Sequence, residues 1–226
     1  MATSGTVTYN LTARKVCDYA LKKIGVVGKA QAVGADDMAT AIRELEVMLK
    51  GWQVDGPNLW RRTTGSQALT ANTASYDLTV TTPHRIWSAR LRHTDGRDVP
   101  LEMLTADEYD ELPLKTSTGT PTSYYYDAQR ANGTLYIWPV LASVTTETVR
   151  YTYQRRFHDV GDENNDLDIP QEYLHLIGYC LADALLDDYG VADTIANRIS
   201  ARAMGLLASA NGADREQVVR FEPEWR

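Results

Sequence analysis

TARKVCDYALKKIG, residues 12–25, has the spacing of an amphipathic helix. Positions i, i+3, i+4 and i+7 share one face of a helix, and here they hold Cys17, Ala20, Leu21 and Ile24. Thr12 suits the capping position before such a helix, and Gly25 suits the position after its last turn. Because an isolated helix cannot bury its own apolar face, the rest of the chain must supply a partner for it.

Three further stretches repeat this periodicity, one soon after the first and two near the end of the chain. The second helix is predicted over residues 36–54, where a long apolar stripe ends at Trp52. Pro170 opens the third, at a first helical position that proline tolerates, and Tyr189-Gly190 ends it. The fourth carries a stripe from Ile195 to Leu207. We expect the first two helices to pack on the last two.

The middle of the chain has the signals of short strands instead. The turn pairs Asp95-Gly96 and Asn132-Gly133 each separate two stretches that suit strands. Thr105 and Glu108 have the spacing of a capping box, which predicts a short helix after Thr105. The longest strand is expected over residues 146–157.

These signals together predict an α+β fold. The N- and C-terminal segments, residues 1–58 and 170–212, form a four-helix layer, and an antiparallel β domain, residues 59–169, is inserted between them. Residues 213–226 have little periodicity and are predicted to form an extended C-terminal tail. The apolar side chains of this tail indicate that it docks onto another protein, and they are Val218, Val219, Phe221 and Trp225.

The composition is ordinary for a soluble globular protein. The 226 residues carry a formal net charge of −7, with 43% hydrophobic and 23% charged residues. No segment is strongly basic, which disfavours tight binding of nucleic acid through its phosphates, although an acidic surface can line a conduit that DNA passes without sticking. Cys17 and Cys180 are predicted to be buried free thiols, which suits a reducing cytoplasm. We expect no signal peptide, no membrane span and no contact with a membrane.

No catalytic or cofactor motif stands out, so we predict no enzyme activity, no cofactor and no metal site. The loop 162–168 alternates oxygen-bearing side chains as a calcium loop does, but Leu167 stands where the turn needs glycine and Tyr173 stands where the last glutamate belongs. Asp183 and Asp187 are spaced as an acid–base pair could be on one helix. A solvated helix face explains them more simply.

Two pairs of arginines flank the predicted β domain. Arg61-Arg62 lies at its start and Arg155-Arg156 lies towards its end. Such pairs could contact DNA in a channel or an acidic neighbour in a ring, or they could simply face water. The sequence leaves all three interpretations open.

A set of short motifs in a fixed order carries a family resemblance. The most specific motif is Gly133-Thr134-Leu135-Tyr136-Ile137-Trp138-Pro139. The others occupy residues 20–25, 41–60, 69–78, 100–101, 119–127, 169–173 and 189–190. In this order and spacing the chain resembles the head-to-tail adaptor proteins of short-tailed phages, a family that includes packaged-DNA stabilisation or tail accessory factors and tail tubular protein A.

The resemblance implies a dodecameric ring of neighbouring copies beneath the portal protein, at the vertex of a capsid. Such a ring extends the DNA channel, helps to retain the packaged genome and gives a platform for tail or nozzle proteins. Packaged double-stranded DNA would pass through without sequence-specific binding. In members of the family the C-terminal segment can reach the portal, a role that would fall here to residues 213–226. The protein would assemble in the host bacterial cytoplasm and reside in the virion neck.

We therefore predict a structural adaptor, which should present complementary side faces on each copy. The alternative is a hydrolase of cell-wall polysaccharides that uses paired Asp and Glu side chains, and it would place two carboxylates across a cleft. A monomeric nucleic-acid-binding module is a weaker hypothesis, because the chain is acidic.

Overall fold

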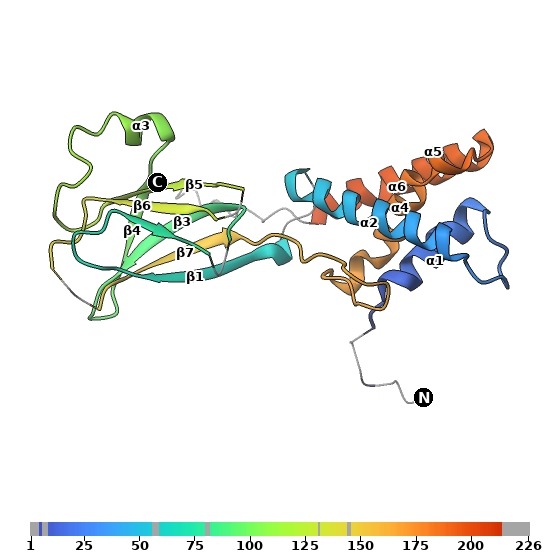
Figure 1. The fold of residues 1–226 in the computed structure, drawn as a ribbon, viewed down its shortest axis with the longest axis horizontal. Helices are drawn as coiled ribbons and strands as arrows, with labels where there is room; N and C mark the ends of the chain where they lie inside the picture. The colour runs from blue at the N-terminus through green and yellow to red at the C-terminus, as the bar shows by residue number, and fades with distance from the viewer. Residues whose placement is uncertain are drawn as a thin grey trace, which may run out of the picture. The chain divides into compact units, whose positions relative to one another are not determined.

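The chain folds into two compact units that are discontinuous in sequence. The computed structural model describes residue 5 and residues 9–55, 59–79, 82–130, 132–143 and 146–213. One unit combines Met1–Leu59 with Phe157–Arg226 and holds the helices at both ends of the chain, and the other, Trp60–Arg156, holds the strands (Figure 1). The α+β class and the insertion of a β-rich domain between helical segments are confirmed.

The helical unit is assembled around α4 (Leu174–Ala184), which contacts α1 (Ala13–Ile24), α2 (Ala35–Asp55) and α6 (Asp193–Ala213). The predicted apolar stripes are the surfaces that meet there. Fully buried side chains come from all four helices, and they include Leu21, Leu45, Ile177, Leu181 and Ile199. The four-helix layer predicted from periodicity is therefore the observed core of this unit.

The third predicted helix is less regular than expected. A 3-10 turn over Gln171–Tyr173 precedes α4, and the short helix α5 (Leu186–Tyr189) follows it. Leu185 separates α4 from α5 because its ψ of −7° departs from helical values. Gly190 then ends α5 in the left-handed conformation, with φ of 55°, as the sequence predicted.

The N-terminus of α1 is satisfied differently from the prediction. Thr12 stands at the capping position, but its side chain makes no capping hydrogen bond. Instead, the backbone N–H groups of Ala13 and Arg14 donate to the carbonyls of Asn165 (3.0 Å) and Glu163 (2.7 Å). A loop distant in sequence thus supplies the acceptors that a helix start requires.

These bonds explain a difference at the domain boundary. We expected residues 157–169 in the β domain, but they belong to the unit that contains the helices. Phe157, Val160, Leu167 and Ile169 are buried. The polar loop between them holds the start of α1 through its backbone, so the returning chain joins the helical unit earlier than its polar composition predicts.

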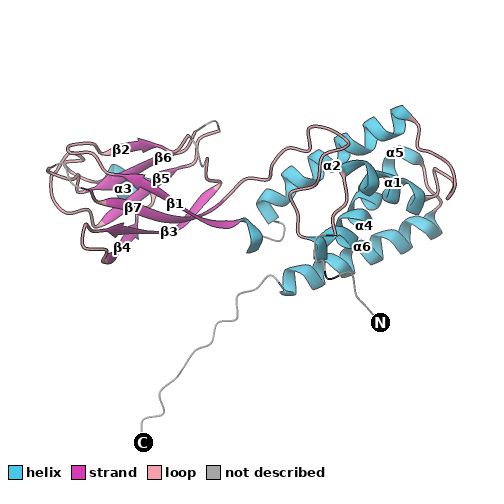
Figure 2. Cartoon of the chain, turned by 90° about the horizontal axis from the view of Figure 1, so that it is seen from below, coloured by secondary structure: helices cyan, strands magenta, loops and turns pink. Residues whose placement is uncertain are grey.

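The β unit contains one seven-stranded sheet in the order β1-β7-β3-β4-β5-β6-β2 (Figure 2). Most neighbours pair antiparallel, as expected, but β4 and β5 pair parallel. The connection between these two strands is long and contains α3 (Ala106–Asp110). Such a connection returns the chain to the same end of the sheet, which a tight hairpin cannot do. The strand bounds are Arg62–Ala68 for β1, Ser75–Asp77 for β2, Arg85–Arg92 for β3, Asp98–Met103 for β4, Ser123–Asp127 for β5, Thr134–Trp138 for β6 and Thr148–Gln154 for β7, and the 3-10 turn Leu59–Arg61 leads into β1.

The predicted turns and the capping box are present in this unit. Gly96, with φ of 87°, lies in the turn between β3 and β4, and β5 and β6 form the second hairpin. The Glu108 N–H donates to Thr105 Oγ1, at 3.3 Å, and the Thr105 N–H donates to Glu108 Oε2, at 2.7 Å. These local signals placed the elements correctly because each depends only on residues close in sequence.

The core of the β unit lies between the two halves of the curled sheet. Alternating residues of β7 and β3 point into it, and residues of β5, β6 and β2 close it from the other side. Tyr151 fits only because β1 has glycine opposite it, since a Cβ on Gly65 would lie 2.5 Å from the Tyr151 ring. The inner face is apolar, and the polar side chains are left to the two outer faces. The core includes Leu91, Val149, Tyr151, Tyr124, Leu135 and Ile137.

We expect Leu45→Ala to lower the free energy of unfolding by about 2–5 kcal/mol, because Leu45 is fully buried where α2 meets its neighbours. Val47 is a matched control on the same helix, with 60% of its surface exposed. Val47→Ala should change the free energy by less than about 0.5 kcal/mol. Urea denaturation of both variants measures the difference. Equal effects would show that the stripe does not form the core.

Candidate interaction surfaces

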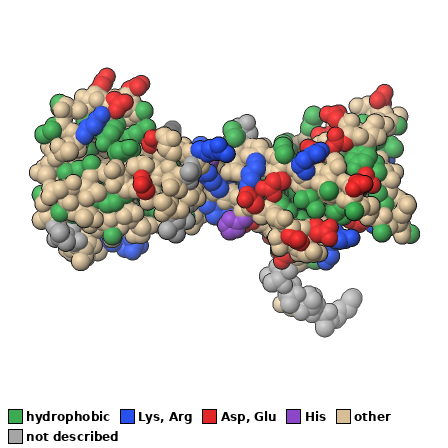
Figure 3. Space-filling view, in the orientation of Figure 1, with side chains coloured by type: hydrophobic (Ala, Val, Ile, Leu, Met, Phe, Trp, Pro, Cys, Tyr) green, Lys and Arg blue, Asp and Glu red, His purple; other side chains and the backbone are tan. Residues whose placement is uncertain are grey.

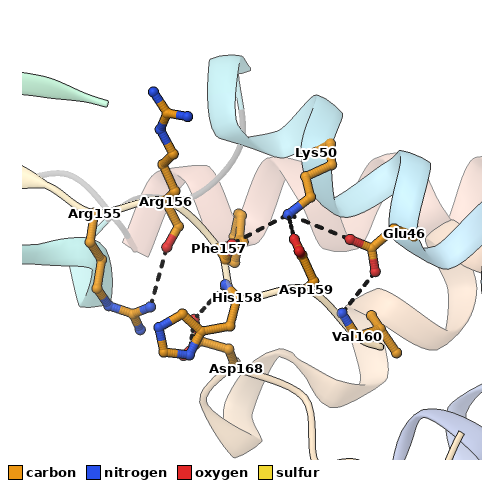
Figure 4. Close-up of polar contacts among 9 residues, drawn as sticks. All are labelled: Glu46, Lys50, Arg155, Arg156, Phe157, His158, Asp159, Val160 and Asp168. Atoms are coloured by element: carbon orange, nitrogen blue, oxygen red, sulfur yellow. Dashed lines mark hydrogen bonds and ion pairs between the residues drawn. The ribbon is translucent and has the colours of Figure 1, made fainter. Parts of the chain in front are cut away.

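Lys50 of α2 holds the returning chain against the helical unit (Figure 4). Its Nζ donates to the carboxylate of Asp159 and to the carbonyl of Phe157 (3.3 Å), and it lies 3.4 Å from Glu46 Oε1. Glu46 Oε2 in turn accepts a bond of 2.8 Å from the Val160 N–H. The bond from Lys50 keeps the pKa of Asp159 below its usual value. Lys50 and Glu46 together therefore tie the return segment to α2 at Phe157, Asp159 and Val160.

The four arginines selected from the sequence do not form one exposed cluster. Arg61 is fully buried, and its carbonyl accepts a bond of 2.9 Å from the Arg155 N–H. Arg62 is exposed, with its guanidinium carbon 5.8 Å from the centre of the Trp87 ring. The buried position of Arg61 is not what a surface contact requires. Arg61 ends the 3-10 turn and Arg62 begins β1, so adjacency in sequence does not place the two side chains in the same surroundings.

Arg155 and Arg156 make contacts at the exit of the β unit. Arg155 Nη1 donates to the carbonyl of Arg156 at 3.5 Å. Arg156 donates to the carbonyls of Arg130 (3.0 Å) and Gln129 (3.3 Å), which follow β5. The guanidinium of Arg156 therefore orders a neighbouring loop. Whether these arginines also contact another copy or a DNA channel remains a proposal.

The tail residues Val218, Val219, Phe221 and Trp225 lie outside the described part of the chain, which ends at residue 213. Ala213, which we assigned to the tail, is the last residue of α6.

The loop 162–168 uses its oxygens within the protein. Glu163 and Asn165 offer their carbonyls to α1, and Asp162 Oδ1 accepts from the Asn164 N–H at 2.8 Å. Across the described residues, no group of three or more His, Cys, Asp or Glu side chains could hold a metal ion. Of the alternating side chains, Asp162 and Asp168 accept hydrogen bonds from backbone N–H groups, that of Asp168 coming from His158.

The remaining chemically active side chains are also engaged in packing. Asp183, one of the paired carboxylates, accepts a hydrogen bond from Ser200 of α6. Cys17 is buried and Cys180 is half-buried, and burial raises the pKa of each thiol to about 12. Neither free thiol is activated as a nucleophile. In the part of the chain that is described, no helix is both long and apolar enough to cross a membrane.

A tyrosine cluster on the outer face of β5 and β6 was not predicted as a surface feature. Tyr109 of α3 stacks on Tyr125 and Tyr136, with ring centres 5.4 Å and 5.0 Å apart. Lys115 caps the cluster, since its Nζ lies 4.9 Å above the Tyr109 ring and 3.0 Å from Asp110. The stack fixes α3 on the outside of the sheet. Only the strand register, which brings Tyr125 opposite Tyr136, could have revealed it.

A second feature missed from the sequence is a row of arginines across β1, β7 and β3. Arg90 lies directly opposite Arg150 in the register of β3 and β7, and Ser66 of β1 lies on the other side of Arg150. Arg62 and Arg85 occupy the same outer face at one end, both beside the Trp87 ring, at 5.8 Å and 5.5 Å. These arginines are scattered in sequence, so no local pattern indicated that they share a face.

A family model described as the SU10 adaptor protein matches residues 15–221, which include both units. The chain belongs to the SU10 adaptor protein family. The adaptor resemblance read from the sequence is confirmed at this level. The family match begins within α1 and includes the other helices and the β insert, so the chain is matched over most of its length rather than through one motif.

Solved structures give more distant likenesses. A chain from the "Neck of empty GTA particle computed with C6 symmetry" is 13% identical, with a TM-score of 0.30, over 81% of this chain and 83% of that chain. A chain from the "Virion of native gene transfer agent (GTA) particle" is 15% identical, with a TM-score of 0.30, over 83% and 81%. At these TM-scores no residue role is transferred. A search of curated proteins finds no match.

We expect His84 to make the β unit less stable in mild acid. Partial burial lowers the pKa of His84 below its usual 6.5, and the charges of Arg61, Arg156 and Arg85 lower it further. The unfolded chain therefore binds this proton at a higher pH than the folded chain, so the stabilisation is present above about pH 6.5 and is lost as the pH falls towards the folded pKa.

Denaturant unfolding at a series of pH values between about 7 and about 5 measures this effect. The wild type should lose more stability across that range than His84→Gln, which has no proton to bind. Identical pH dependence in the two proteins would contradict the assignment.

Proposed function

We propose that this chain acts as a head-to-tail adaptor, forming a ring beneath the portal of a phage particle. The observation that carries the proposal is the match to an adaptor family over residues 15–221. Because the match includes both units, it supports a role for the whole chain as a connector. A protein of this kind works through its surfaces, which agrees with side chains that are engaged in packing in the described residues rather than gathered for catalysis.

The partners in this proposal are the portal protein on one side, tail or nozzle proteins on the other, and neighbouring copies in a dodecameric ring. The ring would extend the DNA channel, help to retain the packaged genome and let double-stranded DNA pass without sequence-specific binding. It would lie in the neck of the virion after assembly in the host bacterial cytoplasm, as the resemblance to short-tailed phage adaptors implies.

The alternative, a hydrolase of cell-wall polysaccharides, finds less support. A glycoside hydrolase needs two carboxylates facing each other across the scissile bond. Asp183 is bonded to Ser200, and Asp187 lies in α5, close along the same chain rather than on an opposing element. No specific observation therefore favours this second function.

Co-sedimentation with the portal protein of the same phage, followed by electron microscopy, tests the proposal. Class averages of the bound particles should show an added ring of density below the portal. A chain that neither sediments with the portal nor appears in those averages is not an adaptor of this kind.

We expect the isolated chain to be monomeric or weakly associated, and to close into a ring only on a portal template. The sequence contains no heptad seam that would drive self-pairing. Light scattering of the purified protein at micromolar concentration measures this. A stable high-order ring without portal would contradict the template requirement, while leaving the adaptor role intact.

Removal of residues 214–226 should leave folding intact and weaken portal docking. The described helical core is built from α1, α2, α4 and α6, and we expect it to fold without residues 214–226. An aromatic anchor contributes about 2 kcal/mol or more to binding, a loss of about 30-fold per site, and many sites in a ring multiply the effect.

Melting curves and co-sedimentation measure the two halves of this prediction. Phe221→Ala with Trp225→Ala in the full-length chain is the matched control, because it keeps the tail length while removing both aromatic anchors. Normal docking of both variants would exclude the tail as the portal anchor. Failure of the shortened chain to fold would place the tail in the core.

A further inference from the structure

We propose that neighbouring copies of the chain pack against each other through two oppositely charged faces of the β unit. The basic face consists of Arg62, Arg85, Arg90, Arg92 and Arg150, and the acidic face consists of Asp77, Asp107, Asp110, Glu111 and Asp127. The inference rests on the proposed ring and names the surfaces that would close it. The occupant of each face is the other face of a second copy.

The basic face brings positively charged side chains close together, and their mutual repulsion destabilises an isolated copy of the protein. Arg90 and Arg150 are directly opposite each other across β3 and β7. Like charges in that position destabilise a sheet. Asp98 of β4 bonds Arg90 (3.0 Å) and Arg92 (2.5 Å), so one carboxylate serves two guanidinium groups. This face therefore has a surplus of positive charge that an external anion would relieve.

The acidic face lies on the opposite side of the same unit, on α3 and the outer face of β5, β6 and β2. Tyr109 points from α3 onto Tyr125 and Tyr136, so Asp107 and Glu111, two residues before and after it, point away from the sheet. Both are exposed. Asp127 and Asp110 approach the tyrosines closely enough to add to the burial that raises the pKa of Tyr125. Lys115 bonds Asp110, and Gln129 and Thr134 donate to Asp127 and Asp77, but Lys115 is the only one of these partners that carries a positive charge, so the face stays acidic.

The two faces point in opposite directions because of how the sheet is built. Side chains alternate along each strand, and the inner residues of both halves share one core. The arginines therefore lie outside β1, β7 and β3, and the carboxylates lie outside β5, β6 and β2. In Figure 1, α3 lies beyond β5 and β6, on the side away from β1 and β7. Figure 3 shows red side chains gathered at the α3 edge of the β unit and a small blue patch at its opposite edge.

Opposite faces of opposite charge suit a head-to-tail contact between copies. A contact that uses two different patches of one protein continues from copy to copy, and it closes into a ring when the rotation allows. Each copy supplies one acidic face for every basic face, so the charges balance around the ring. DNA is an alternative occupant of the basic face, because its phosphates would bind the arginines and the Thr and Ser hydroxyls of β1. DNA would leave the acidic face without a partner, however, so a second copy of the chain is the better occupant.

Charge reversal tests the proposal with two variants in the presence of the portal. The first variant, Arg85→Glu with Arg150→Glu, cancels the positive charge of the basic face and places two carboxylates on it. The second, Asp107→Arg with Glu111→Arg, cancels the negative charge of the acidic face and places two guanidinium groups on it. Each alone should form at least about tenfold fewer rings on the portal than the wild type, because the introduced charges would meet like charges at every contact. An equimolar mixture should restore rings in which the two variants alternate.

Rescue by mixing excludes misfolding, since unfolded variants could not restore one another. Lys29→Glu with Arg97→Glu is the matched control for the first variant, because it makes the same change of charge at exposed turn positions outside both faces. It should assemble as the wild type does. Electron microscopy counts the rings. Mass measurement of the mixed rings shows whether they contain the two variants in equal numbers, as alternation requires.

Three outcomes would overturn the proposal. Normal assembly of either variant alone would show that its altered face is not a contact. Failure of the mixture would show that the two faces do not meet. Normal rings that no longer retain double-stranded DNA would assign the arginines to DNA. A wild type that forms no ring on the portal would instead contradict the proposed function itself, and this inference with it.

Discussion

The burial of α4 is the constraint on which the helical unit depends. α1 and α2 come from the N-terminal part of the chain and α6 from the C-terminal part, and all three contact α4. Ile177 and Leu181 of α4 have no exposed surface, and neither have Leu21 of α1 and Leu45 of α2. Neither end of the chain can bury its apolar stripes alone. The unit therefore forms only when segments on both sides of the β insert come together.

The β insert permits this because its first and last strands pair with each other. β1 and β7 are neighbours from Arg62 opposite Gln154 to Ala68 opposite Thr148. The chain thus enters and leaves the β unit side by side, and the loop-closure entropy that the helices must overcome stays small. After the exit, Lys50 and the first turn of α1 hold the returning segment. The insert can then carry surface chemistry without altering the helical core.

Features that depend on neighbouring residues could be predicted from the sequence, and features that depend on distant ones could not. Helix periodicity, the turn at Gly96 and the capping box at Thr105 are local, and each was present as expected. The acceptors for α1 come from a loop near the other end of the chain, so the capping role of Thr12 was wrong. The parallel pairing of β4 and β5 likewise follows from a long connection that no local pattern describes.

The arginines at the candidate surfaces show the same difference between local and distant features. Adjacency in sequence selected Arg61 with Arg62, yet one side chain is buried and the other is exposed. Register across strands instead places Arg90 beside Arg150, although many residues separate them along the chain. Strand pairing therefore brings charges that are scattered in sequence onto one face of the sheet. Because the sheet curls around its core, a second set of charges lies on the outer face of its other half. Such charged faces are where the sequence of an adaptor can encode a choice of neighbour.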